Sequence, residues 1–346
     1  MTAKAMLRIK RQYSVVVHGP DVVELRCGVW NPISFTLRDE SGAGYLYRLI
    51  RGLDGSVSSR DLSKREDVPR TEVEALIDHL DQLGVLESTS ASAFDYYLDT
   101  LVPTLSGAMP QVQSRNVLLL GDEVVTQNIR TLLAASSAAP AIKSGDGGEW
   151  DLLHRGDTSW LTNGLEYQQR VAPFERWKDS LLVYAVTSID PVRFQIVNRI
   201  AMAHGIPWIH AAIDGPFLFI GPTVVPRRTA CYECFEARVV MNLREQSSYQ
   251  RYKEALAQGR VLRRPSPIEP VVASVLASHI AMEVVNFLTT GNDFTMGKTL
   301  AIYLPTMEFS FSDVLRLPNC PACGSSPEKD DRELYFDMRA LFSARQ

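Results

Sequence analysis

The chain has 346 residues, of which 22% are charged, and a formal net charge of −4 at pH 7. This length is sufficient for two or three domains with a sizeable core. The small acidic excess excludes proteins that bind nucleic acids or membrane surfaces through overall basic charge. The N-terminus lacks the apolar segment of a signal peptide, and we find no run of about 18 apolar residues, so we expect no membrane contact.

The first 40 residues predict short strands. Residues 13–37 contain β-branched runs that are separated by turn sequences at 18–21 and at Asn31-Pro32, which is typical of two or three strands. Cys27 lies in the second run, and we interpret it as a buried strand residue.

Three helices follow and end at Gly84. In the third, Thr71 and Glu74 have the spacing of a capping box. Apolar residues then recur at helical spacing, at Val73, Leu76, Ile77, Leu80 and Leu83. A hairpin, three helices and a small wing within residues 1–90 predict a compact winged-helix domain of the α+β class.

The predicted winged helix leaves three functions open. Winged helices often bind DNA, but the third helix, residues 71–84, is acidic, which disfavours contact with phosphates. An exposed edge strand beside a helix can instead accept an extended peptide as an added strand. A plain dimerisation module is the remaining alternative.

The second domain begins after a linker. We assign residues 91–112 to a short helix and loop and residues 113–330 to the domain. Residues 116–121 predict a buried parallel strand that opens a nucleotide-binding βαβ unit. The expected GxGxxG phosphate loop is reduced to Gly121, and Asp122 and Glu123 place negative charge where a polyphosphate would lie. We therefore expect a nucleotide-binding scaffold without bound ATP.

Residues 136–180 have the composition of a loop, and the two strands and the ribose-binding acid expected there are not evident. Lys143 and Asp146 are either remnants of a nucleotide site or solvated loop residues, and we favour the second interpretation. Further along, a helix from Asp190 and strands at 179–187, 207–212 and 217–225 alternate. This alternation predicts a mostly parallel sheet that helices cover.

The last third contains three further segments. Residues 235–265 are polar and basic, and we expect them to be partly mobile; the Arg260–Arg264 cluster is either a solvated face or a contact for an acidic partner. Residues 268–290 predict a long buried helix whose small residues are compatible with a homodimer interface. Two strands at 298–317 and a charged tail at 331–346 complete the chain.

Four of the five cysteines form two CxxC couples, Cys231 with Cys234 and Cys320 with Cys323. A two-residue spacer lets both sulfurs of a couple face one metal, so four thiolates predict a closed tetrahedral Zn²⁺ site with a structural role. The alternative is a redox motif or two unrelated reduced couples. An odd cysteine count that is mostly committed to a metal is typical of a reducing cytoplasm.

These features resemble the ThiF/MoeB-type E1-like superfamily, whose members adenylate the C-termini of peptides or proteins. The resemblance covers roughly residues 93–324. It is most specific at residues 207–234, a strand–turn–strand run into the first cysteine couple, and the couple at 320–323 completes it. The resemblance implies an α/β domain of Rossmann type with a zinc tetrathiolate.

Departures from this superfamily concern its catalytic residues. The glycine-rich ATP loop is replaced by GDEVVTQ, and the basic residues that hold phosphates cannot be placed. Residues 187–189 stand near the family's catalytic aspartate, but Asp190 is shifted, so we assign no catalytic residue. No cysteine lies between Cys234 and Cys320, so the thioester nucleophile of ubiquitin-type E1 enzymes is missing.

Residues 1–90 resemble the PQQ-chaperone-like recognition element of RiPP pathways, which make ribosomally synthesised and post-translationally modified peptides. In that family a leader peptide adds to the third strand and packs on the third helix. Here these elements would be residues 33–37 and 71–83. The peptide-binding residues that the resemblance implies are Ile33, Phe35, Leu37, Glu72, Ala75 and His79.

A recognition element joined to a degenerate E1-like domain resembles the ocin-ThiF-like partner proteins of azole-forming cyclodehydratases. The resemblance implies a non-catalytic cytoplasmic subunit of antibiotic biosynthesis, which binds a precursor leader and presents the core to a separate YcaO-type cyclodehydratase. A self-sufficient E1-like enzyme that adenylates a peptide, as microcin- and pantocin-type maturases do, is the first alternative. A DNA-binding regulator is the second.

Overall fold

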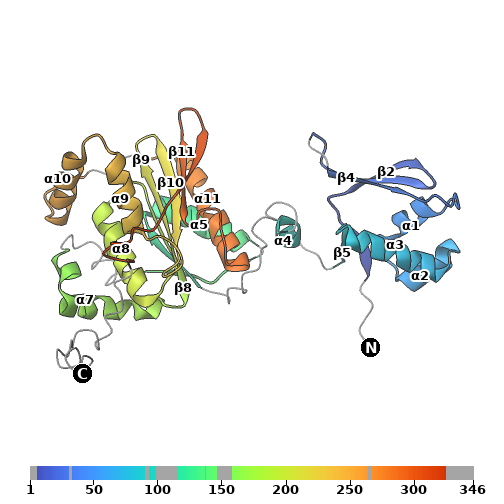
Figure 1. Ribbon diagram of the computed structural model, residues 1–346, viewed down its shortest axis with the longest axis horizontal. Coiled ribbons are helices and arrows are strands. Elements are labelled where there is room, and N and C mark those ends of the chain that lie inside the picture. Colours follow the sequence, from blue (N-terminus) through green and yellow to red (C-terminus); the bar gives the residue numbers. More distant parts are fainter. Residues whose placement is uncertain are drawn as a thin grey trace, which may run out of the picture. The chain divides into compact units, whose positions relative to one another are not determined.

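The computed structural model divides the chain into two compact units, Met1–Pro103 and Thr104–Gln346 (Figure 1). The predicted domain boundaries at 90, 112 and 330 stay predictions. Most of the predicted linker, Asp146, Arg264 and the predicted tail lie outside the described residues, which are 6–30, 33–89, 93–98, 116–136, 138–145, 158–263 and 267–324.

The first unit contains a three-stranded antiparallel sheet in which the central strand is β3, so β2 and β4 are edge strands. The bounds are β2 Ser14–Gly19, β3 Val22–Cys27 and β4 Ile33–Arg38. A separate antiparallel pair, which we did not predict, joins β1 Leu7–Ile9 to β5 Leu86–Ser88. Cys27 does end a strand, but it is half-buried rather than buried.

Three helices share one apolar core with this sheet: α1 Leu46–Gly52, α2 Ser59–Glu66 and α3 Arg70–Gln82. The core contains Val23 and Leu25 of β3 and Val73 and Leu80 of α3, all with no exposed surface. The predicted capping box is wrong, because α3 already begins after Pro69 and Thr71 lies inside it. Glu74 accepts a hydrogen bond from Arg70 one turn earlier, at 2.8 Å.

The second unit is built on a seven-stranded mixed sheet in the order β12-β11-β10-β9-β8-β6-β7 (Figure 1). Strands β7, β6, β8 and β9 are parallel, whereas β10, β11 and β12 are added antiparallel, so the sheet is less parallel than predicted. The bounds are β6 Asn116–Gly121, β7 Ile142–Ser144, β8 Ser180–Val186, β9 Trp208–Asp214, β10 Phe217–Val224, β11 Lys298–Tyr303 and β12 Glu308–Asp313.

Helices cover both faces of this sheet. Alternate residues of a strand point to opposite faces, so Val117 and Leu119 of β6 pack with α5 and α11, whereas Leu118 and Leu120 pack with α8. This arrangement explains why the predicted strands are apolar throughout. The helices are α5 Glu123–Ala135, α7 Gly164–Val171, α8 Pro191–His204, α9 Tyr232–Asn242, α10 Gln246–Ala257 and α11 Pro270–Thr290.

Two segments that we predicted to be irregular contain regular secondary structure in their described parts. Within 136–180, Lys143 lies on the short strand β7 with an exposed side chain, and η3 Ser159–Thr162, α7 and η4 Ala172–Trp177 follow. The described residues from 235 to 263 contain most of α9 and all of α10, and their partial mobility stays a prediction. Buried aromatic residues anchor the first of these segments, since Trp160, Phe174 and Trp177 join the core beside α8.

Helix α11 is long and apolar enough to cross a membrane by length and composition alone, although we predicted no such run. More than half of its apolar window is buried inside the unit, where it packs against α5 and the sheet. A core helix passes the same test of length and composition. The predicted buried helix at 268–290 therefore agrees with the structure.

Candidate metal centre

The two cysteine couples come together in the second unit. Cys231 is the N-cap residue of α9 and Cys234 lies in its first turn, whereas Cys320 and Cys323 lie in a turn after β12. All four side chains are buried. Gly324 closes the second turn, because its backbone N–H donates to the carbonyl oxygen of Cys320 at 2.8 Å, and a Cβ atom there would lie only 2.5 Å from that oxygen.

The four sulfurs have the spacing of a tetrahedral metal site. All four lie within 4.8 Å of one another, with Sγ–Sγ distances of 3.5 Å between Cys231 and Cys320 and 3.4 Å between Cys234 and Cys323. A regular tetrahedron with Zn–S bonds of about 2.3 Å has S–S edges of about 3.8 Å. The cluster therefore fits one zinc ion, with no position left for water or substrate.

The electrostatics of this cluster favour a cation. Hydrogen bonding to the Cys320 sulfur raises the pKa of the Cys231 thiol, and burial raises the pKa of the Cys234 thiol to about 11. Four thiolates cannot share so small a buried volume unless a positive charge compensates them. Zinc would supply that charge, and its binding would release the thiol protons. These properties favour a bound metal cation.

One arginine links the two couples independently of the metal. Arg199 of α8 makes a two-pronged ion pair with Glu233, which lies inside the first couple, at 2.6 and 3.2 Å. Its third nitrogen donates a hydrogen bond to the carbonyl oxygen of Pro321, inside the second couple, at 2.8 Å. The neighbouring Asn198 accepts a hydrogen bond from the backbone of Tyr232 at 3.1 Å. Helix α8 thus holds both turns in position.

Sequence reasoning missed this pair of residues. Asn198 lies among the buried residues of helix α8 with no exposed surface, and Arg199 beside it is partly buried. A polar residue at a position that helical periodicity assigns to the core is the signal that could have identified them, because buried polar groups require partners.

The predicted nucleotide position lies where β6 ends. Its last residue, Gly121, has φ 126°, and a Cβ atom there would overlap the carbonyl oxygen of Ala185 at 1.7 Å, so only glycine lets the ends of β6 and β8 approach this closely. The Asp122 carboxylate accepts hydrogen bonds from the backbone N–H and the hydroxyl of Thr187, both at 2.6 Å. Asp122, which stands where the phosphate loop would be, therefore binds Thr187 at the end of the neighbouring strand β8.

Asp190, which we did not assign to catalysis, caps helix α8. Its carboxylate accepts hydrogen bonds from the backbone N–H groups of Val192 and Arg193 and lies 3.4 Å from the Arg263 guanidinium. Arg263 also donates to the Ile189 carbonyl at 2.9 Å. The solvated-face interpretation of the 260–264 cluster is thus wrong for Arg263.

The predicted peptide-binding residues lie on two elements of the first unit. On β4, Ile33 is 61% exposed and Phe35 is half-buried, but Leu37 belongs to the core, so only its backbone could contact a peptide. On α3, an exposed face carries Glu72, Ala75 and His79. Among the described residues, no hydrogen bond or ring contact joins the two sets, and their role stays a prediction.

Two solved heterocyclases share the fold of this chain. The heterocyclase TruD aligns with 92% of the chain at a TM-score of 0.65 and 18% identity, and a heterocyclase in complex with substrate and cofactor aligns at 0.63 and 18%. The chain spans only 43% and 39% of the lengths of these two proteins.

The Escherichia coli enzyme MccB is a further structural neighbour. The microcin C7 biosynthetic enzyme MccB, solved with N-formylated MccA, aligns with 92% of this chain and 99% of its own length, at a TM-score of 0.53 and 15% identity. A structure of E. coli MccB with ATP aligns at 0.51 and 16%. No family model and no curated protein matches the sequence. The similarity therefore establishes a shared mixed α/β fold.

Proposed function

We propose that this chain is a non-catalytic subunit of RiPP biosynthesis. It binds the leader of a ribosomally synthesised precursor peptide and presents the core to a separate YcaO-type cyclodehydratase, which forms azolines. Tethering the leader makes modification of the core effectively intramolecular. This chain would therefore speed the reaction by raising the local concentration of the core at the cyclodehydratase and would perform no chemical step itself. The zinc site stabilises the second unit.

The observation that carries this proposal is the altered nucleotide position. An adenylating enzyme binds phosphates with backbone N–H groups at a helix N-terminus. Here the corresponding loop places the Asp122 carboxylate against Thr187, and Arg263 is paired with Asp190 at the start of α8. A polyphosphate at this position would face the negative charge of Asp122 and would compete with an existing hydrogen-bond network.

The heterocyclase similarity supports a role in RiPP biosynthesis. This chain matches less than half of each heterocyclase, at 43% and 39% of their lengths. Solved neighbours with bound substrate or with MccA also support peptide binding.

In the proposed complex the leader pairs with the free edge of β4 and packs on α3. Among the described strands β4 pairs only with β3, and its Ile33 side chain is largely exposed. Backbone hydrogen bonds would supply affinity, and contacts of leader side chains with Ile33 and Ala75 would supply specificity.

Calorimetric titration of the zinc-loaded protein with Mg-ATP and, separately, with the leader encoded nearby tests the proposal. We expect leader binding without ATP binding. Because a buried isoleucine side chain contributes about 1.5–3 kcal/mol, Ile33→Asp should weaken leader binding by at least tenfold. Val15→Asp, on the opposite edge strand β2, is the matched control. Equal binding by both variants would contradict the placement on β4.

The alternative is a self-sufficient peptide-adenylating enzyme, which the alignment with nearly the full length of MccB favours. It predicts ATP–pyrophosphate exchange that depends on the precursor peptide and needs no partner protein. Exchange above background would replace the subunit proposal with this one.

A further inference from the structure

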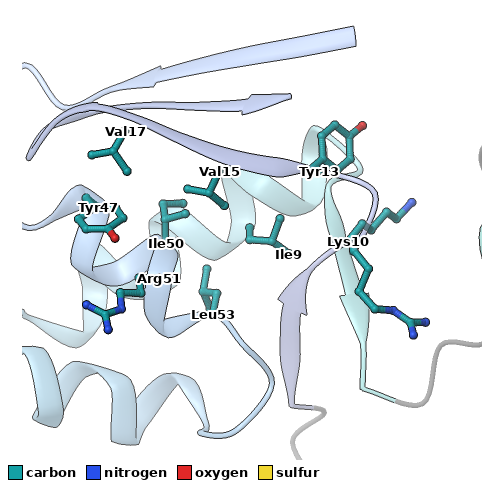
Figure 2. Close-up of a pocket in the computed structure, with 10 residues that line it drawn as sticks. Ile9, Lys10, Tyr13, Val15, Val17, Tyr47, Ile50, Arg51 and Leu53 are labelled. Carbon is teal, nitrogen blue, oxygen red and sulfur yellow. The ribbon is translucent and has the colours of Figure 1, made fainter. Parts of the chain in front are cut away.

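A pocket of about 340 Å³ lies in the first unit beside β2, which is the edge strand opposite to β4 in the three-stranded sheet. Strand β2, helix α1 and the segment 9–13 enclose it (Figure 2). The proposed function does not use this pocket, because strand β2 and the proposed leader edge β4 are separated by β3.

The floor of the pocket is apolar and its wall is an edge strand. Val15 and Val17 project from β2 and are 38% and 47% exposed, and Ile50 and Leu53 face them (Figure 2). Since β2 pairs only with β3 among the described strands, the hydrogen-bonding groups on its other side remain open to an added strand. Valines two residues apart point to the same face, as alternate apolar residues of an added strand would.

The ends of the pocket are basic. Lys10 lies at one end and Arg51 at the other (Figure 2). Arg11 also lines the pocket, and the ten lining residues include no carboxylate. Arg11 lies 3.0 Å from Glu87, outside the pocket, whereas no ion pair of Arg51 is found within the described residues. A six-residue strand such as β2 is about 20 Å long, so a partner segment of similar length would reach both ends.

We propose that this pocket is a second peptide-binding site, which takes an extended partner segment with alternating apolar residues and an acidic residue at each end. The segment adds to β2 as an antiparallel or parallel strand. Its apolar side chains pack on Val15 and Val17, and its carboxylates pair with Lys10 and Arg51. An ion pair at each end fixes the register of the segment on β2. A uniformly apolar groove would leave this register undetermined.

Selection of phage-displayed random 12-residue peptides on the full-length zinc-loaded protein tests this site. A preceding subtraction on the Val17→Asp variant removes phages that bind elsewhere. The selected peptides are then synthesised, and their affinities are measured by fluorescence anisotropy. Val17 is half-exposed and Arg51 is exposed, so neither variant should alter the fold, and circular dichroism checks this.

We expect peptides with alternating apolar residues between acidic ends, and at least tenfold weaker binding to Arg51→Glu, which the selection does not impose. A peptide with lysine in place of one acidic end should regain affinity for Arg51→Glu. Ile33→Asp on β4 should bind as the unaltered protein does, which separates this site from the proposed leader site. Failure to enrich any peptide, enrichment without acidic ends, or loss of binding in Ile33→Asp alone would overturn the proposal.

Discussion

Replacing Arg199 by alanine should destabilise the second unit more than removal of any surface charge. The guanidinium is 15% exposed and the Glu233 carboxylate only 7%, so the substitution leaves a buried carboxylate without its cation. Breaking one partner of a buried ion pair costs about 3–5 kcal/mol. The loss of the hydrogen bond to Pro321 also frees the second cysteine turn, so zinc should dissociate faster.

Urea unfolding of the zinc-loaded protein, followed by tryptophan fluorescence, measures this effect. The buried residues Trp160 and Trp208 pack in the same core cluster as Cys231 and report on the second unit. Lys298→Ala is the matched control, because its pair with Asp313 is exposed at 3.5 Å and should contribute less than about 1 kcal/mol.

A double substitution separates the ion pair from general packing. In Arg199→Ala with Glu233→Gln no charge is left buried, so part of the lost stability should return. Zinc release to a chromogenic chelator gives an independent readout. A loss below about 1 kcal/mol, or an unchanged release rate, would refute the idea that Arg199 holds the two cysteine turns together.

Three further predictions concern the same unit. Cys320→Ser should abolish stoichiometric zinc, measured by elemental analysis, and lower the urea midpoint as a chelator does. Gly324→Ala should cost about 1–3 kcal/mol of unfolding free energy, because its Cβ atom would lie 2.5 and 2.7 Å from the carbonyl oxygens of Cys320 and Pro318. Burial raises the pKa of Glu283 to about 8 and that of Asp293 to about 7, from 4.5 and 3.8. Between about pH 4 and pH 8 the native state therefore retains protons that the unfolded chain has released. The free energy of unfolding falls as the pH rises through this range, by up to ~1.4 kcal/mol per pH unit for each proton. Glu283→Gln should flatten that slope in unfolding measured across this range, and an unchanged slope would contradict the assignment.

The metal centre could be predicted from sequence because its signal is local. A CxxC couple fixes the positions of two ligands within one turn, and two such couples suffice to predict a tetrahedral site. The supporting residues could not be predicted in this way. Arg199 and Glu233 are far apart in the chain, and only the packing of α8 against α9 makes them neighbours.

The strands were predicted more reliably than the segments between them. Apolar runs such as 116–120 and 180–186 identify buried strands, because both faces of the sheet are covered. By contrast, α10 has no buried residue, and its polar sequence reads as a loop. Its position depends on tertiary contacts instead, including the bonds of Tyr249 and Lys253 to Glu236, at 2.6 and 2.7 Å.

The role of Asp122 can be tested through stability as well as through nucleotide binding. Two hydrogen bonds of 2.6 Å to one carboxylate exceed a neutral bond in strength, but Thr187 is partly exposed and water can replace them in part. We therefore expect Asp122→Ala to cost about 1.5–3 kcal/mol in urea unfolding.

Glu123→Ala removes the same charge one residue further along and is the control, with an expected cost of about 0.3–1 kcal/mol from the first turn of α5. If Asp122 has replaced a phosphate site, Asp122→Ala should still bind no Mg-ATP in calorimetry, since neither the glycine-rich loop nor a phosphate-binding lysine returns with alanine. A variant that gains ATP binding would show that the carboxylate alone blocks an otherwise intact nucleotide site. The chain would then be better explained as an adenylating enzyme that this acid holds inactive.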